Sequence, residues 1–516
     1  MSVSRRTFMF SGLALAGTGA LAACSSSGSA VHPVAQTGAA YLSPSGPEVL
    51  AAEQARGGGA VRSVTLAAVE TAADLGAGTV VSTWTYGGAL PGRPIRVTAG
   101  EVLEATVVNQ LPQSTTIHWH GLRLRNDMDG VPGVTQDPIA PGGRFRYRFT
   151  VPDPGTYWIH PHTGVQQDRG LYAPLIVDDP REPLSYDAEW TVVLDDWLDG
   201  TGTTPDDVLA RLSGGMGGMD HGSTGAMPGG GSGHGNGAES RMLRGATSKA
   251  LGGDPGDVAY THYLVNGRVP ADPDVFHGKP GQRVRIRILN AGGDTAFRVA
   301  LGGHTMTVTH ADGLPVRQAD AKSLLLGMGE RYDVLVTLGS GVFPFTASAE
   351  GKNALARALV RTAPGTAPDP DVRPAELDGQ PLVAARLAPA EHVALPAKEI
   401  DRTVRLELTG GMAKYDWGIN GRRYDPAYRD LVRAGERVRL EFVNKTAMWH
   451  PMHLHGHSFA MANPGMGGAR KDTAAILPGQ TLFADFDADN PGLWMIHCHN
   501  VYHAETGMMS LLGYEV

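Results

Sequence analysis

Apolar and polar residues alternate in three short stretches spaced along the chain. Residues 102–109, 284–290 and 438–444 each place apolar side chains at every second position and end in Asn. A turn signal, Ala-Gly-Glu or Pro-Gly-Gln, stands shortly before each stretch. Alternation with a period of two predicts a strand with one buried face. We therefore expect three equivalent strands, one in each of three repeated units.

A second pattern occurs late in the first unit and again late in the last. Residues 154–162 read Pro-Gly-Thr-Tyr-Trp-Ile-His-Pro-His, and residues 491–499 read Pro-Gly-Leu-Trp-Met-Ile-His-Cys-His. The middle unit has Gly-Val-Phe-Pro-Phe at 341–345 instead, and its stretch 297–304 has no His pair. The repeats predict an all-β protein of three tandem β-sandwich domains. The middle domain is expected to keep the fold without the paired His.

The repeats and the Gly-, Ser- and Pro-rich stretches between them also predict the domain boundaries. We expect a leader at 1–23, a flexible tether at 24–60, a first domain at 61–180, a second domain at 187–361 with a Met- and Gly-rich insertion at 213–237, a Pro-rich linker at 362–398 and a third domain at 399–516.

Composition agrees with this architecture and excludes one class of function. The chain has 516 residues, too many for one core, and its 69 Gly and 35 Pro interrupt long helices. Its formal net charge is -8. A protein that binds DNA or RNA usually carries an excess of basic residues. We therefore expect no nucleic-acid partner.

The first residues resemble an export signal. Residues 4–8 read Ser-Arg-Arg-Thr-Phe, a twin-arginine start, and an apolar run follows to Ala23. The run is at the short limit for a membrane span and is diluted by Gly, Ser and Thr. It ends in Leu-Ala-Ala-Cys, which resembles a lipoprotein cleavage box with Cys24 as the acylated residue. We expect export by the twin-arginine machinery and a lipid anchor at the cell envelope, with simple secretion as the alternative.

Cysteine usage indicates a metal. The chain has two Cys, and a lipid on Cys24 leaves Cys498 without a disulfide partner in a compartment where thiols usually pair. Cys498 stands between His497 and His499. A lone thiolate between two imidazoles is typical of a metal site.

Ten of the nineteen His fall in four short segments, at 118–120, 160–162, 450–455 and 497–503. On a strand, residues two apart point to the same face, so each His-x-His pair can present two imidazoles to one cavity. A single pair would indicate zinc or chance equally well. Four segments in two homologous units favour copper.

One strand is expected to serve two different sites. His497 and His499 share a face, and Cys498 points the opposite way. One Cys, two His and a weak axial Met form the ligand set of a blue-copper site. Cys498, His503 and Met508 supply this set within one strand and loop, and His450 completes it.

The four segments closely resemble the copper signatures of multicopper oxidases, a family of three-domain, laccase-like proteins, and the resemblance covers residues 61–516. It is closest to the actinobacterial lipoprotein branch, which is linked with copper resistance. The resemblance implies three Greek-key cupredoxin domains and four copper ions. It implies these ligands: His450, Cys498, His503 and Met508 for type 1; His118 and His453 for type 2; His120, His160 and His499 for one type 3 copper; His162, His455 and His497 for the other.

The resemblance also implies the reaction. Four one-electron oxidations are coupled to the reduction of dioxygen to water, with Cys498 collecting electrons. Asp129 stands where the family often has a carboxylate near the type 2 copper. Several bacterial relatives have Glu directly after the last type 1 His, where this chain has Ala504. Glu505 either substitutes for that Glu or is merely solvated.

Two reductants remain open. The insertion at 213–237 contains twelve Gly with Met and His residues, and thioethers favour Cu(I). These Met residues either collect Cu(I) for oxidation or are incidental to a flexible segment. The competing hypotheses are a laccase-like oxidase of phenols or aromatic amines and a copper-sequestering lipoprotein without turnover. Because one chain holds both ligand-bearing domains, we expect a monomer.

Overall fold

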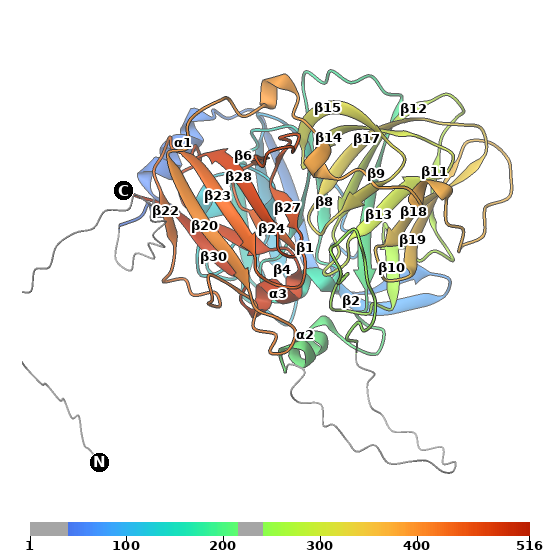
Figure 1. The fold of residues 1–516 in the computed structure, drawn as a ribbon, viewed down its shortest axis with the longest axis horizontal. Helices are drawn as coiled ribbons and strands as arrows, with labels where there is room; N and C mark the ends of the chain where they lie inside the picture. The colour runs from blue at the N-terminus through green and yellow to red at the C-terminus, as the bar shows by residue number, and fades with distance from the viewer. Residues whose placement is uncertain (1–39, 215–240) are drawn as a thin grey trace, which may run out of the picture. The chain divides into compact units, whose positions relative to one another are not determined.

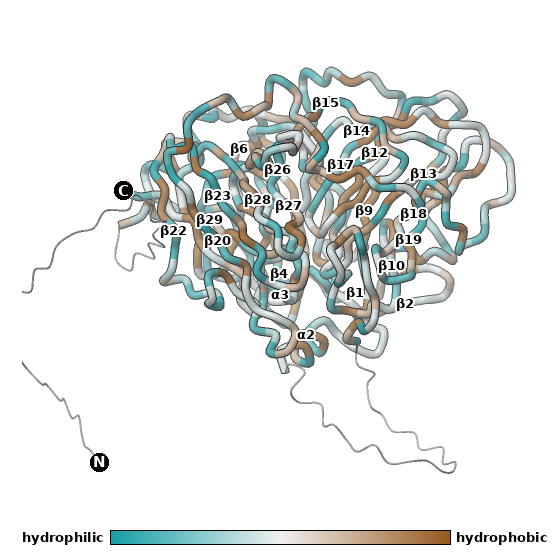
Figure 2. Tube along the Cα trace, viewed as in Figure 1, coloured by the Kyte–Doolittle hydropathy of each residue, from teal (hydrophilic) through white to brown (hydrophobic). Residues whose placement is uncertain are grey.

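Strands dominate the computed structural model, which describes residues 40–214 and 241–516 (Figure 1). The export signal, Cys24 and nearly all of the Met- and Gly-rich insertion lie outside the described residues. Six sheets form in the described part of the chain, two from each third of the sequence. The prediction of an all-β fold is confirmed. In Figure 2 hydrophobic and hydrophilic residues follow one another along the strands.

The first pair of sheets uses strands from residues 61–178. One sheet has the order β2-β1-β4-β6 and the other β3-β8-β7-β5. Their strands are β1 (Val61–Gly76), β2 (Thr79–Tyr86), β3 (Ile95–Thr98), β4 (Val102–Asn109), β5 (His118–His120), β6 (Arg144–Thr150), β7 (Gly155–His160) and β8 (Ala173–Asp178).

The second pair of sheets has the orders β10-β9-β12-β17-β14-β15 and β11-β19-β18-β13-β16. A helix, α2 (Pro205–Ser213), follows β9 and is capped by Thr204. The strands are β9 (Ala188–Trp197), β10 (His262–Val265), β11 (Asp274–His277), β12 (Arg283–Asn290), β13 (Phe297–Leu301), β14 (Met306–Ala311), β15 (Leu314–Ala321), β16 (Leu324–Leu326), β17 (Arg331–Thr337), β18 (Val342–Ala349) and β19 (Ala354–Arg361).

The third pair has the orders β21-β20-β23-β28-β25-β26 and β22-β30-β29-β24-β27. A short helix, α3 (Val501–Thr506), joins its last two strands. The strands are β20 (Arg402–Thr409), β21 (Gly418–Ile419), β22 (Asp430–Val432), β23 (Arg437–Asn444), β24 (His450–Leu454), β25 (Phe459–Met461), β26 (Arg470–Lys471), β27 (Thr473–Ile476), β28 (Thr481–Asp487), β29 (Leu493–Cys498) and β30 (Met509–Tyr514).

The three strands expected from the alternation are β4, β12 and β23, and each ends in a buried Asn. In each case the Asn amide donates to two backbone carbonyls, and its oxygen accepts the N–H two residues later. The Asn thereby satisfies the backbone where the strand stops and the chain crosses to the opposite sheet. This shared role explains why Asn109, Asn290 and Asn444 recur.

Part of the expected tether is ordered. Residues 47–55 form the helix α1 (Pro47–Ala55), inside the range predicted to be flexible. Glu53 accepts the N–H of Thr150, and Arg56 donates to Asn490, so the segment is tied to residues far away in sequence. The sequence pattern did not predict this helix, because the residues that hold it in place, Thr150 and Asn490, lie outside the segment.

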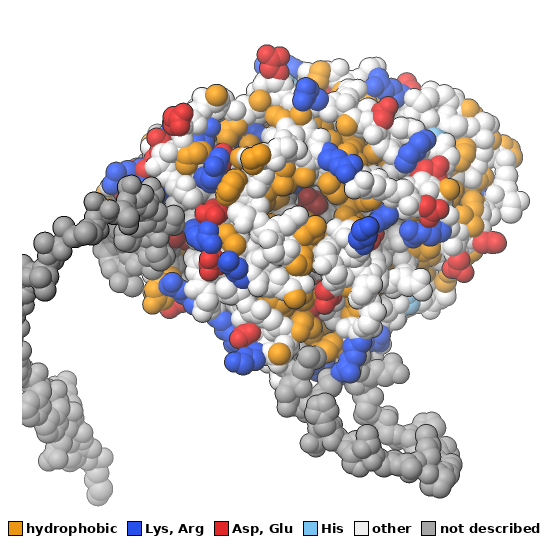
Figure 3. Space-filling model, viewed as in Figure 1, with side chains coloured by type: hydrophobic (Ala, Val, Ile, Leu, Met, Phe, Trp, Pro, Cys, Tyr) orange, Lys and Arg blue, Asp and Glu red, His pale blue; other side chains and the backbone are white. Residues whose placement is uncertain are grey.

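The described helices include none that is long and apolar enough to cross a membrane. On the face shown in Figure 3, acidic and basic side chains of the described residues are interspersed.

Candidate metal centre

The first His pair lies on β5, where alternation separates core from cavity. Trp119 points into the core against Tyr147 and Phe149, with ring centroids 5.4 and 5.0 Å away. His118 and His120 therefore point to the other face. β5 pairs with β7 so that His118 lies opposite His160. β7 ends at His160, so His162 follows the strand instead of continuing it, and it still lies beside the other His rings.

The third domain repeats this arrangement. β24 and β29 pair so that His453 lies opposite His497 and Met452 opposite Cys498. β29 ends at Cys498, and His499 lies just beyond it. The expected division holds, because His497 and His499 join the other cluster His while Cys498 joins a separate group with His450 and His503.

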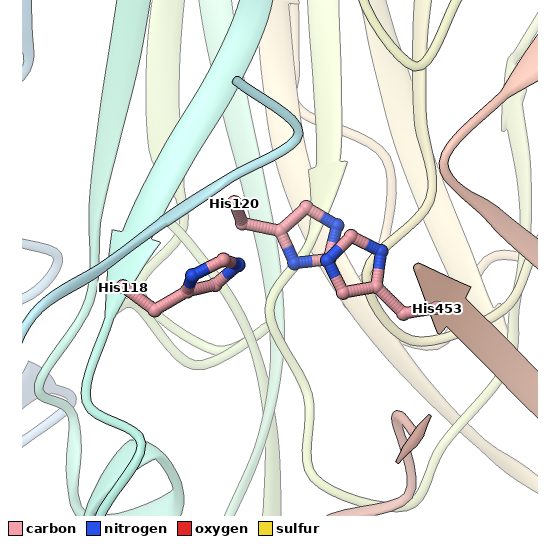
Figure 4. Close-up of side chains that lie close together, drawn as sticks. All are labelled: His118, His120 and His453. Atoms are coloured by element: carbon pink, nitrogen blue, oxygen red, sulfur yellow. The ribbon is translucent and has the colours of Figure 1, made fainter. Parts of the chain in front are cut away.

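Two His pairs stack across the first and third domains. His118 stacks on His455 and His120 stacks on His453, each with ring centroids 3.8 Å apart. Figure 4 shows His118 and His120 from β5 converging with His453 from β24. The Nε2 atoms of His162 and His497 are 3.2 Å apart. Eight imidazoles from two domains thus surround one buried space.

Within this space and beside it, potential ligand atoms approach within 4.8 Å of one another in five groups. The groups are His118, His120 and His453; His120, His160 and His499; His162, His455 and His497; His450, Cys498 and His503; and His118, Asp129 and His455. The residues that the family resemblance assigns to each type 3 copper, and three of its four type 1 residues, fall in common groups.

The hydrogen bonds of the rings fit metal binding. In several rings one nitrogen is held by the protein: His118 Nδ1 by the Asp129 carbonyl, His160 Nδ1 by the Pro161 carbonyl and His497 Nδ1 by the Cys498 carbonyl. Buried nitrogens without a hydrogen-bond partner among the described residues include His118 Nε2, His120 Nδ1, His160 Nε2, His453 Nε2 and both nitrogens of His499. Unpartnered buried nitrogens are costly unless a ligand occupies the space between them. A cluster of this kind fits copper.

Electrostatics favour the neutral form of these rings. Burial, followed by repulsion among neighbouring His, lowers the pKa well below its ordinary value for His160, His162, His455, His497 and His499. Burial also lowers the pKa of His120 and His453. A neutral imidazole keeps a lone pair for a metal ion.

The separate group contains the thiol. Cys498 Sγ lies 3.7 Å from Nδ1 of His450 and 3.7 Å from Nδ1 of His503, and all three residues are fully buried. Met508 is buried in the same core cluster, and its carbonyl accepts the N–H of Cys498. Two imidazoles and a thiol lie together here, and a Met thioether is the donor that would complete the set of a blue-copper site.

Asp129 lies at the His cluster and Glu505 does not. Asp129 Oδ2 accepts from His455 Nδ1 at 2.9 Å, and its Oδ1 has no hydrogen-bond partner among the described residues. The backbone next to Asp129 passes close to Ile117, which only glycine permits. Gly130 has φ 83°, and a Cβ there would lie 1.8 Å from the Ile117 carbonyl oxygen. Glu505 lies on α3 outside all five groups, and burial beside Asp206 raises its pKa to about 7.

Several residues at the site carried no recognisable sequence pattern. Asp257 Oδ2 accepts from His503 Nε2 at 2.9 Å and from the Tyr415 hydroxyl at 2.6 Å. This carboxylate outweighs burial and raises the pKa of His503 to about 10. Asp472 accepts from His120 Nε2 at 3.1 Å. Isolated Asp residues give no motif, so only the fold could associate them with the His.

Comparisons with known proteins agree with the geometry. Residues 68–182, 189–364 and 398–514 each match a model described as multicopper oxidase. The chain is 48% identical to multicopper oxidase MmcO of Mycobacterium tuberculosis, over 99% of this chain and 96% of that protein. It is 29% identical to a copper resistance protein A homolog of Pseudomonas syringae pv. tomato, over 82% and 87%.

A comparison with a solved structure supports the fold. The crystal structure of a laccase from Botrytis aclada is similar with a TM-score of 0.70 and 25% sequence identity, over 88% of each chain. The near full-length relative, the three family matches and the fold all agree with the clustered His and Cys. The chain belongs to the multicopper oxidase family and is a copper-binding oxidoreductase.

Proposed function

We propose that the chain binds four copper ions with the ligands that the family resemblance implies. His450, Cys498, His503 and Met508 hold type 1 copper, and the eight other clustered His hold the trinuclear set. The five groups of close ligand atoms and the unpartnered ring nitrogens support this assignment. Bound copper supplies one-electron redox chemistry, so that four electrons can reduce dioxygen to water.

The protein connects the two sites through its own backbone. Cys498 is flanked by His497 and His499, and its carbonyl accepts from His497 Nδ1 at 2.8 Å. This short covalent and hydrogen-bonded connection supports electron transfer from the thiol side to the His cluster. Asp129 is proposed to take part in proton transfer beside the cluster, where its Oδ1 lies 3.2 Å from His118 Nδ1. Glu505 is proposed to exchange protons on the thiol side, and Glu505→Gln tests that role.

We propose Cu(I) as the reductant, and one observation carries this proposal. His503, Asp257, Tyr415 and Trp417 are all 0% exposed. Because the described residues bury the His503 ring completely, a phenol or aromatic amine cannot contact its edge. Asp257 Oδ1 is buried without a hydrogen-bond partner, which suits a small cation better than an aromatic molecule. Copper resistance proteins among the relatives support the same substrate.

The proposals on export and domain organisation rest on the sequence patterns. We propose twin-arginine export, a lipid on Cys24 at the cell envelope and a monomer. Residues 61–180, 187–361 and 399–516 are proposed as the three domains, which the two sheets within each range support. The segment at 362–398 is then the link between the last two.

Oxygen uptake and metal analysis test the proposed function. Copper-loaded protein is expected to hold four copper ions per chain, to be blue, and to consume oxygen with Cu(I) faster than with a phenol. A zinc-filled, colourless protein would contradict the ligand assignment. Preference for the phenol would assign the chain to the laccase-like alternative.

A further inference from the structure

The middle domain contributes none of the ten clustered His, yet one of its side chains binds the carboxylate that accepts a hydrogen bond from His120. Arg331 is the first residue of β17 and is 0% exposed. Its Nη1 and Nη2 donate to Oδ1 and Oδ2 of Asp472 in the third domain, both at 2.7 Å. Its Nε donates to the carbonyl of Thr156 in the first domain at 3.1 Å. One guanidinium therefore joins all three domains.

Asp472 and Thr473 hold the outer nitrogens of a stacked His pair. Asp472 Oδ1 accepts from His120 Nε2 at 3.1 Å, and the Asp472 carbonyl accepts from His453 Nδ1 at 2.8 Å. Thr473 Oγ1 lies within 3.2 Å of both of those nitrogens. A proton on His120 Nε2 leaves Nδ1 to face the cluster, and a proton on His453 Nδ1 leaves Nε2 to face it.

A second residue of the middle domain supports the same dipeptide. Asp312 Oδ2 accepts the N–H groups of Asp472 and Thr473 at 3.3 and 3.2 Å, and Asp312 Oδ1 accepts the N–H of Arg331. The space is tightly filled. A Cβ on Gly121 would lie 2.5 Å from Arg331 Nη2 and 2.6 Å from Asp472 Oδ2. Any side chain at position 121 would therefore displace the guanidinium and the carboxylate.

We propose that Arg331 is a positioning residue for the trinuclear copper site. Its planar, bidentate contact fixes the plane of the Asp472 carboxylate, which in turn fixes the orientation and tautomer of His120. The middle domain thus helps to build a site to which it gives no ligand. The inference rests on the proposed ligand set, because it concerns how those ligands are held.

Arg331→Met tests the role, with Arg298→Met as a matched control. Arg298 makes a similar two-bond contact with Glu350 in the same domain and touches no clustered His. Copper per chain, the type 2 electron paramagnetic resonance signal and the blue absorption band are measured together with thermal unfolding. Loss of a partner that orients a ligand typically costs about 10–100-fold in metal affinity.

Arg331→Met is expected to weaken trinuclear copper binding about 10–100-fold and to change the type 2 signal, while the blue band per chain persists. Arg331→Lys, which keeps the charge without the fork, should recover only part of the affinity. Arg298→Met should leave both signals unchanged. Wild-type trinuclear signals in Arg331→Met, or equal loss of the blue band, would overturn the inference. Failure of the unmodified protein to bind copper would instead overturn the proposed ligand set.

Discussion

Asn444→Ala tests whether the recurring strand-end Asn holds the loop that carries a copper ligand. The Asn444 amide donates to the carbonyls of Met448 at 2.7 Å and Ile476 at 3.0 Å, and its oxygen accepts from the Thr446 N–H at 2.9 Å. The side chain is 1% exposed, so water cannot replace these bonds. Thr446 Oγ1 in turn lies 2.8 Å from His450 Nε2.

Three buried hydrogen bonds to the backbone at about 1 kcal/mol each predict a loss of about 3 kcal/mol in the free energy of unfolding, to which the bond from Thr446 Oγ1 to Asn444 Oδ1 at 2.9 Å adds. For a domain of this size that corresponds to roughly 10 °C in Tm. Copper-free protein is unfolded in urea and by heat to measure the loss. The blue band of copper-loaded protein reports separately on the loop that leads to His450.

Asn109→Ala is the matched control, because Asn109 makes the same three bonds in the first domain, to Gln113, Ile139 and Leu111. It should cost a similar free energy but leave the blue band unchanged, since its loop leads to His118 instead. The reasoning is refuted if both variants lose well under 1 kcal/mol, or if Asn109→Ala changes the blue band as much as Asn444→Ala does.

Three further results are expected. Cys498→Ser should abolish the blue colour and oxidase activity with little change in circular dichroism, and retained turnover would exclude Cys498 as the electron entry point. Deleting the insertion at 213–237 should lower oxygen uptake with Cu(I) while uptake with a phenol stays equal or rises; equal loss of both would indicate a structural role. Burial alone would raise the pKa of Asp333, but Arg285 and Arg287 outweigh it and hold that pKa well below its ordinary value. The stabilisation is therefore present above the ordinary Asp pKa of about 3.9 and is lost as pH falls below it, so Asp333→Asn should flatten the acid dependence of unfolding, measured by urea titration at several pH values.

Much of the fold and of the clustering of the His residues and Cys498 could be predicted from the sequence, because the informative signals are local. A period of two specifies which face of β4 and β23 is more buried. It is wrong for β12, where Arg285 and Arg287 on the polar face are also buried because they pair with acidic residues. His118-x-His120 lies wholly on β5, so strand geometry alone places its two imidazoles on one face. Likewise, the three residues His497, Cys498 and His499 are enough to indicate a metal site.

Local patterns failed where a residue acts on a distant one. The helix at 47–55 is held by groups such as Thr150 and Asn490, so composition alone predicted a tether. His162 and His499 were expected on strands, although both strands end one or two residues earlier.

The surroundings of the ligands were decided only by the tertiary structure. Asp257 reaches His503 across 246 residues, and Asp472 reaches His120 across 352. Arg331 belongs to a domain without His pairs, and nothing in its sequence predicts a contact with Asp472 beside the His cluster. A ligand is recognisable from its own chemistry and spacing, whereas the group that orients it is defined by proximity. Proximity exists only once three sandwiches have packed together.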